Sequence, residues 1–130
     1  MALMVGATRD AAYIAEGRGL RAARLRAVMA DISAHLEDGG LTAAVVAARQ
    51  RVTPRYAHML FEGEGLTFSE FVLGQRLARA HRLLTDPRCS ERTIGSIAFD
   101  VGFGDLSYFN RAFRRRYNAT PTEVRHSARN

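Results

Sequence analysis

The sequence predicts an all-α protein in which two helix-turn-helix subdomains are joined by a long central helix, with about seven helices in total. Apolar residues recur at three- and four-residue steps in several segments, and capping or stop residues separate those segments. An imperfect repeat of about 51 residues relates the two halves. With 130 residues and 47% apolar content, the chain suits one or two small cores and is too short for a large enzyme fold.

The charge of the chain is uneven. Formal charge is +6, residues 1–40 hold equal numbers of arginines and acids, and the excess therefore lies after residue 40. All 19 basic residues are arginine, which favours forked contacts to phosphates and guanine edges, although a genomic composition bias explains this equally well. No apolar run approaches the roughly 20 residues of a membrane span. We expect a cytoplasmic protein with no membrane contact.

Three parts are predicted along the chain. Residues 1–19 show no sustained period and are interpreted as an irregular tail or the remnant of an upstream domain. Residues 20–85 form the first helix-turn-helix subdomain with the central helix, and residues 86–130 form the second subdomain. A packing helix is expected to begin at Leu20, because an apolar stripe follows it, and to end at the glycine pair that starts at Gly39.

Each subdomain contains a short helix, a turn and a second helix. In the first, Thr53 and Pro54 are typical of an N-cap and a first helical residue. In the second, Gly102 is predicted to stop a helix in a left-handed conformation, Phe103 to plug the angle between two helices, and Asp105 to cap the next one. The two units correspond with one residue inserted in the later turn: Ala47, Val52, Tyr56, Leu60 and Phe61 match Ala98, Phe103, Tyr108, Ala112 and Phe113.

The central helix lies between these units. Thr67 and Glu70 form a predicted capping box, and Gly74 in the helix interior suggests the close approach of another element. A helix of about 18 residues spans about 27 Å, which is compatible with the roughly 34 Å between successive major-groove faces of B-DNA. It could therefore hold two recognition helices, roughly Pro54–Glu62 and Leu106–Tyr117, in adjacent major grooves.

These motifs resemble the DNA-binding domain of the AraC/XylS family of bacterial transcriptional regulators. The resemblance covers about Leu20 to Arg125 and is strongest in the second half. It rests on Ile94, Ile97-Ala98, Val101-Gly102-Phe103, Tyr108-Phe109, Arg111, Phe113, Thr120-Pro121 and Arg125, together with Thr53-Pro54-Arg55-Tyr56 and Leu60-Phe61. The chain departs from the family pattern at Arg51, where a turn glycine is common, at Asn118, which replaces a frequent glycine, and at Val124, where an aromatic is usual.

The resemblance implies a sequence-specific transcriptional regulator that binds an asymmetric promoter site on double-stranded DNA as a monomer unit. RNA polymerase is a further candidate partner. Most members carry an effector-binding or dimerising domain before this region, so the chain is either a stand-alone small regulator or, as we favour, part of a longer one. The residues implied to contact bases are Arg55, His58 and Met59 in the first unit and Ser107, Asn110 and Arg111 in the second. Arg76 matches a central-helix arginine that is structural in similar proteins.

The chemistry of these side chains suits base reading. Arg111 can donate two parallel hydrogen bonds to guanine O6 and N7, and Asn110 can pair with adenine. Thr53 and Thr93 begin helices whose N–H groups suit phosphates, and Arg114 begins an arginine run that can contact the backbone. The alternative for each is a solvated surface residue, and for Met59 a packing residue. Structural roles are predicted for Arg76, Gly102 and Phe103, and for Pro121, which opens the last helix.

An enzymatic function is not expected. No pair of carboxylates and no set of metal-spaced ligands stands out, and Cys89, the single cysteine, lies in a predicted linker. No cofactor and no metal are expected. The open alternative is a basic helical module that binds nucleic acid or acidic partner proteins without sequence specificity, which competition and salt dependence would distinguish.

Overall fold

The computed structural model describes residues 2–129, with side chains from residue 9 onward, and these residues form helices and connecting turns without strands. The all-α prediction is confirmed. The α-helices are α1 (Ala2–Ala34), α2 (Ala43–Arg49), α3 (Pro54–Glu62), α4 (Phe68–Thr85), α5 (Ile94–Asp100), α6 (Leu106–Tyr117) and α7 (Pro121–Arg129), and a 3-10 turn, η1 (Pro87–Cys89), follows α4.

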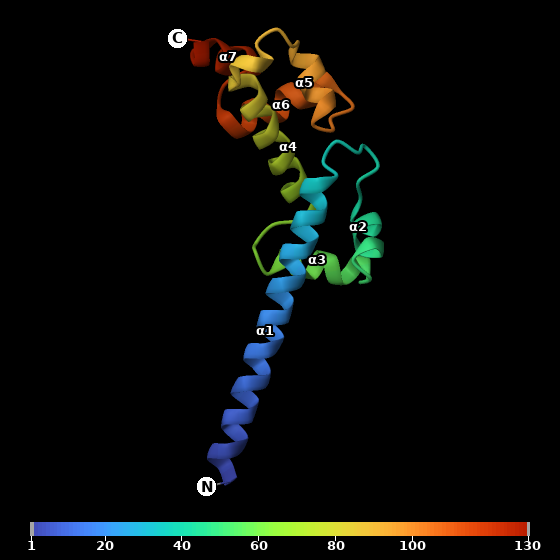
Figure 1. Ribbon diagram of the computed structural model, residues 1–130, viewed down its shortest axis with the longest axis vertical. Coiled ribbons are helices and arrows are strands. Elements are labelled where there is room, and N and C mark those ends of the chain that lie inside the picture. Colours follow the sequence, from blue (N-terminus) through green and yellow to red (C-terminus); the bar gives the residue numbers. More distant parts are fainter. Residues whose placement is uncertain (1, 130) are drawn as a thin grey trace.

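The molecule is elongated, and its two helix-turn-helix units follow one another along its long axis (Figure 1). The first unit consists of α2 and α3, which pack beside the C-terminal half of α1. The second unit consists of α5 and α6 and lies with α7 at the far end of α4. The 18 residues of α4 connect the two units and match the predicted length of the central helix.

Each unit has its own hydrophobic core. The first core is formed by Leu25, Val28, Ile32, Leu36, Leu41, Val46, Leu60, Phe61, Phe68 and Val72. The second core is formed by Leu77, Ala80, Leu84, Ile97, Ala98, Val101, Phe103, Phe109 and Phe113. The first half of α4 thus contributes to one core and its second half to the other, so packing fixes α4 at both ends.

The prediction of an irregular segment at residues 1–19 is wrong for the described residues, because α1 begins at Ala2 and continues through Leu20. The described part of this segment is rich in alanine, a strong helix former, and Gly17 and Gly19 cost only roughly 1 kcal/mol each in a helix. Between residues 9 and 24, where burial is described, α1 buries no face, which agrees with the lack of an apolar period there. The helix also ends earlier than predicted, at Ala34, and turns lead on to Gly39.

Helix starts and stops follow the predicted capping residues. The hydroxyl oxygens of Thr53 and Thr93 accept hydrogen bonds from the backbone N–H groups three residues later, at 3.1 and 3.0 Å. The Asp105 carboxylate does the same at 3.1 Å, and the capping box of Thr67 and Glu70 is complete. Local sequence therefore fixes where each recognition helix begins.

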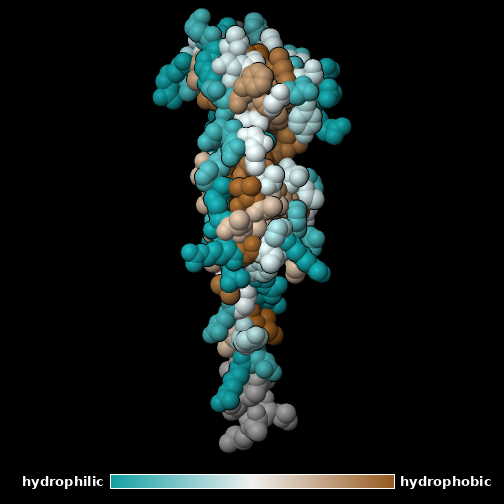
Figure 2. Space-filling model, turned by 90° about the vertical axis from the view of Figure 1, so that its right-hand side faces the viewer, coloured by the Kyte–Doolittle hydropathy of each residue, from teal (hydrophilic) through white to brown (hydrophobic). Residues whose placement is uncertain are grey.

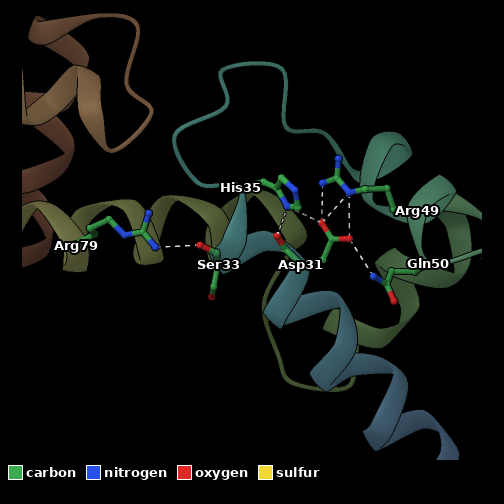
Figure 3. Close-up of polar contacts among 6 residues, drawn as sticks. All are labelled: Asp31, Ser33, His35, Arg49, Gln50 and Arg79. Carbon is green, nitrogen blue, oxygen red and sulfur yellow. Dashed lines mark hydrogen bonds and ion pairs between the residues drawn. The ribbon is translucent and has the colours of Figure 1, made fainter.

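A polar cluster around Asp31 fastens the first unit to α1 (Figure 3). Asp31 is 9% exposed and accepts three hydrogen bonds from the Arg49 guanidinium at 2.6–3.1 Å, and one from the Gln50 amide at 2.9 Å. The hydrogen bond from Arg49 is the main cause that lowers the pKa of Asp31, and burial opposes it. From α4, Arg79 donates to the Ser33 carbonyl oxygen at 2.9 Å. Polar contacts thus join α1 to both α2 and α4.

Aromatic packing holds the second unit to α4. Phe113 is fully buried, and its ring centroid lies 4.8 Å from that of Tyr117. The His81 ring of α4 lies 4.7 Å from the same tyrosine, and Phe103 lies 4.9 Å from Phe109. Phe103 is 5% exposed, so it fills the angle between α5 and α6.

Candidate nucleic-acid interface

The first recognition helix, α3, has one buried and one exposed face. Ala57, Leu60 and Phe61 are buried against the first core. This orientation leaves Arg55, His58 and Met59 exposed, and Met59 is 53% exposed although it is apolar. The structure thus brings the three predicted base contacts of α3 to its solvent side.

The second recognition helix, α6, is longer and more basic. Phe109 and Phe113 are buried, whereas Ser107, Asn110 and Arg111 are exposed. Arg114, Arg115 and Arg116 occupy its last turn, where positive charge also interacts favourably with the helix dipole. The left-handed Asn118, with φ 55°, ends the helix as predicted.

The residues predicted to contact the DNA backbone are also accessible. Thr53 and Thr93 are exposed at the N-termini of α3 and α5, and Arg114 is exposed on α6. The first-turn N–H groups of a helix attract anions because they lack intrahelical acceptors. The structure places these three residues where they could position a duplex without reading its sequence.

Arg76 joins α4 to the turn that follows α1. From α4, its Nε donates to the Leu36 carbonyl oxygen at 2.9 Å and its Nη2 to the Asp38 carbonyl oxygen at 3.0 Å. Burial lowers the pKa of the guanidinium, which nevertheless remains charged. Gly102, with φ 111°, packs directly on this contact, because a Cβ there would collide with the Leu36 carbonyl oxygen and the Arg76 Nε. Pro121 is buried at the first position of α7.

Two surface hollows flank the recognition helices, and they occupy equivalent places in the repeat. Adding 52 to the number of each residue of the first hollow gives a residue of the second. The first hollow, between α1 and α3, is lined by Arg18, Arg21, Ala22, Leu25, Met59, Leu60, Gly63 and Glu64. The second, between α4 and α6, is lined by Glu70, Leu73, Gly74, Leu77, Tyr108, Arg111, Ala112, Arg115 and Arg116. The repeat therefore includes α1 and α4 as well as the two helix-turn-helix units.

The surroundings of Gly74 are open. The prediction that another element approaches this glycine closely is wrong, since a Cβ built there would meet nothing within 4 Å. Gly74 lines the open hollow beside Arg111.

The candidate site residues predicted from the sequence did not include the arginines of α1. Arg18, Arg21 and Arg24 lie on exposed positions of α1, and Arg24 stacks over the Tyr56 ring of α3 at 5.4 Å. The equal numbers of arginines and acids over residues 1–40 hid this feature, because no acid occurs from residue 17 to residue 30. Counting charges over a shorter stretch, residues 17–30, would have revealed this excess of arginine.

Comparison with known proteins identifies the family. The matching family model describes a helix-turn-helix domain and covers residues 46–127. The chain belongs to the AraC/XylS family. Among the relatives, the transcriptional activator RhrA of Rhizobium meliloti is 40% identical over 105 residues, which are 81% of this chain and 33% of that protein. The arabinose operon regulatory protein of Escherichia coli is 33% identical over 103 residues, which are 78% of this chain and 34% of that protein.

Solved structures support the same assignment. An AraC-type transcriptional regulator from Chromobacterium violaceum has a TM-score of 0.74 and 27% identity, and the match covers 81% of this chain and 91% of that one. The C-terminal domain of AraT, a response regulator from Geobacillus stearothermophilus, has a TM-score of 0.73 and 28% identity, covering 80% and 84%. This AraC-type chain contains a sequence-specific DNA-binding domain of transcriptional regulation, and its relatives have regulatory, non-enzymatic roles.

The AraC-type chain spans about a third of the length of the curated relatives it matches. Within its described residues, no helix combines the length and apolar character needed to cross a membrane. The same residues contain no group of three or more histidine, cysteine or acidic side chains that could hold a metal ion.

Proposed function

We propose that this chain binds promoter DNA by placing α3 and α6 in two successive major grooves on one side of the duplex. The observation that carries the proposal is the structural repeat: two recognition helices present equivalent exposed faces and are joined by the continuous helix α4. The two units differ in sequence, so the binding site would be asymmetric. A single chain would then cover both half-sites.

The proposed base contacts are made by the exposed residues of each recognition helix. Arg111 is the strongest candidate, because its exposed guanidinium can donate two hydrogen bonds to a guanine. Asn110 and Ser107 accompany it on α6, and Arg55, His58 and Met59 act from α3. Phosphates would be held by Arg114 and by the helix N-termini at Thr53 and Thr93.

We further propose that DNA binding by this chain serves transcriptional activation in the bacterial cytoplasm. The resemblance to the activator RhrA supports this role. RNA polymerase would be the partner in activation. The length of the relatives also supports an effector-binding or dimerisation domain upstream in the intact regulator.

Selection from a randomised duplex pool tests specific binding. The selected duplex and a scrambled duplex of equal composition are then compared in binding assays over a series of salt concentrations. We expect a preference of about 10³-fold or more for the selected duplex, while affinity for the scrambled duplex falls steeply with salt. Equal binding of the two duplexes at every salt concentration would instead support the basic module without sequence specificity.

The spacing of the two half-sites tests the role of α4. Inserting five base pairs between the half-sites turns one of them by about half a helical turn, to the opposite side of the duplex. Because α4 is packed into both cores, it cannot follow this rotation. Affinity should fall to that of a duplex with only one half-site. Unchanged affinity after the insertion would contradict simultaneous binding by α3 and α6.

A further inference from the structure

The exposed part of α1 extends beyond α3 in the direction away from α6 (Figure 1). If a duplex follows the line from α6 to α3, this part of α1 lies over the base pairs that flank the first half-site. Figure 2 shows the coloured part of this helix as a narrow rod that carries both hydrophilic and hydrophobic surface. The inference that follows rests on the proposed function, since it places α1 relative to DNA bound by both recognition helices.

The arginines of α1 lie beside a predicted base contact. Arg18 and Arg21 line the same hollow as Met59 of α3. Arg24, one or two turns further along α1, stacks over Tyr56. From Arg18 to Arg24 the helix rises about 9 Å, and one strand of B-DNA presents a phosphate about every 3.4 Å. This row of charge can therefore meet two or three successive phosphates.

The equivalence of the two hollows supports an anionic partner at both. In the second hollow the positive charge comes from the recognition helix, through Arg111, Arg115 and Arg116, and Glu70 stands on the α4 side. In the first hollow the positive charge comes instead from α1, and the acidic residue follows α3. Arg18 stands in the place of Glu70, and Glu64 in the place of Arg116. Both hollows thus remain net positive, although different helices provide the charge.

Arg18 and Arg21 differ from Arg24, which stacks over Tyr56. Among the described residues, no ion pair joins Arg18 or Arg21 to Glu64 or to another acid. Both side chains are exposed. From these observations we propose that Arg18 and Arg21 of α1 bind DNA phosphates flanking the first half-site, so that the interface extends beyond the two recognition helices.

The test uses the duplex selected above in three forms: ending at the outer edge of both half-sites, or extended by about ten base pairs at one end or at the other. The wild-type chain should bind one of the two extended forms more tightly than the short form. Arg18→Ala/Arg21→Ala should lose this gain. Alanine is a good helix former, so α1 should persist, and circular dichroism checks this.

A matched control removes the same charge from the same helix. Arg9 and Arg26 are exposed on α1, and helical geometry turns each of them at least about 80° away from both Arg18 and Arg21. Arg9→Ala/Arg26→Ala should keep the gain from the extended duplex. Arg18→Gln/Arg21→Gln should behave like the double alanine variant, because the charge of the side chain and not its length makes the contact.

Salt dependence gives a second readout. Loss of two phosphate contacts lowers the slope of log affinity against log salt by about 1.8. Between 50 and 200 mM salt, the affinity of the wild type for the extended duplex should therefore fall about 12-fold more than that of Arg18→Ala/Arg21→Ala. Equal slopes, or an equal loss of affinity for all three duplexes, would overturn the proposal, as would a wild type that gains from neither extension.

Two failures can be told apart. A wild type that binds selected and scrambled duplexes alike refutes the proposed function itself. A wild type that prefers the selected duplex but ignores both extensions refutes only the flanking contact.

Discussion

Arg51 and Gly102 occupy the same place in the turns of the two helix-turn-helix units, and both have positive φ angles, 57° and 111°. Their surroundings differ. Arg51 is exposed, whereas Gly102 is buried against Leu36 and Arg76 at the junction of the subdomains. The shared turn therefore requires a left-handed residue in both units, but only the second unit requires that residue to be glycine.

The two units also differ in how they are held and in what they offer to DNA. The first unit adds a buried carboxylate, Asp31, to its hydrophobic core, whereas no polar or charged side chain is buried among the described residues of the second unit. The recognition helix α6 ends in three arginines, whereas α3 has Glu62 in its last turn. We infer that the second unit supplies more of the DNA-binding energy. Substitutions at equivalent positions can test these differences.

Gly102→Ala should have the largest effect on stability. The new Cβ would collide with the Leu36 carbonyl oxygen and Arg76, and alanine would have to adopt a left-handed conformation. Strain and overpacking together should lower the free energy of unfolding by about 3 kcal/mol. Urea denaturation measures this loss. Gly104→Ala is the control, since a Cβ there meets nothing within 4 Å, and equal losses in the two variants would refute the role of the junction.

In free energy, the next largest effect should be that of Arg111→Ala, which acts on DNA binding and not on stability. Loss of a bidentate guanine contact should cost about 2 kcal/mol and relax preference at one base position. Met59→Ala, at the equivalent position of α3, should cost less than about 1 kcal/mol, because only an apolar contact is lost. Fluorescence anisotropy with single-base variants of the selected duplex measures both. Arg115→Ala should weaken all sequences alike, so profiles indistinguishable from those of Arg111→Ala would contradict the assignment.

Asp31→Asn should destabilise the first unit in a pH-dependent way. Asp31 has a lowered pKa in the folded state, so its contribution is present above the unfolded pKa and is lost as pH falls through the folded pKa. At pH 7 we expect a loss of about 1.5 kcal/mol, below that of a fully buried pair because the Arg49 side chain is 34% exposed. Urea denaturation between about pH 2 and 7 should show this difference shrink below about pH 4.

Asp86→Asn provides the comparison for Asp31. The pKa of Asp86 is also lowered by its hydrogen bonds with Arg88, but the Arg88 side chain is 90% exposed. This variant should therefore change the free energy of unfolding much less than Asp31→Asn at every pH, because water screens an exposed pair. If the difference in the free energy of unfolding between wild type and Asp31→Asn stayed constant between about pH 2 and 7, the proposed link between the pKa of Asp31 and stability would be wrong.

Local signals made the second unit and the starts of α3, α4 and α6 predictable. Caps at Thr53, Thr67 and Asp105 and the stop at Gly102 involve neighbours in sequence, so their residue types are sufficient evidence. The continuous helix α1 was not predictable in this way, because its first 18 residues have no sustained apolar period. Its correspondence with α4 became visible only when the two hollows could be compared in space.

Arg51→Gly should have the smallest effect, and with the opposite sign to Gly102→Ala. The left-handed conformation costs arginine about 1–2 kcal/mol, whereas glycine avoids this cost but loses about 0.5–1 kcal/mol of chain entropy on folding. Because Arg51 is exposed, and no ion pair involves it among the described residues, a net gain of about 0.5 kcal/mol is expected in urea denaturation. Lower stability in Arg51→Gly would mean that the arginine contributes to the first turn beyond its backbone conformation, and the two turns would then differ in more than their packing.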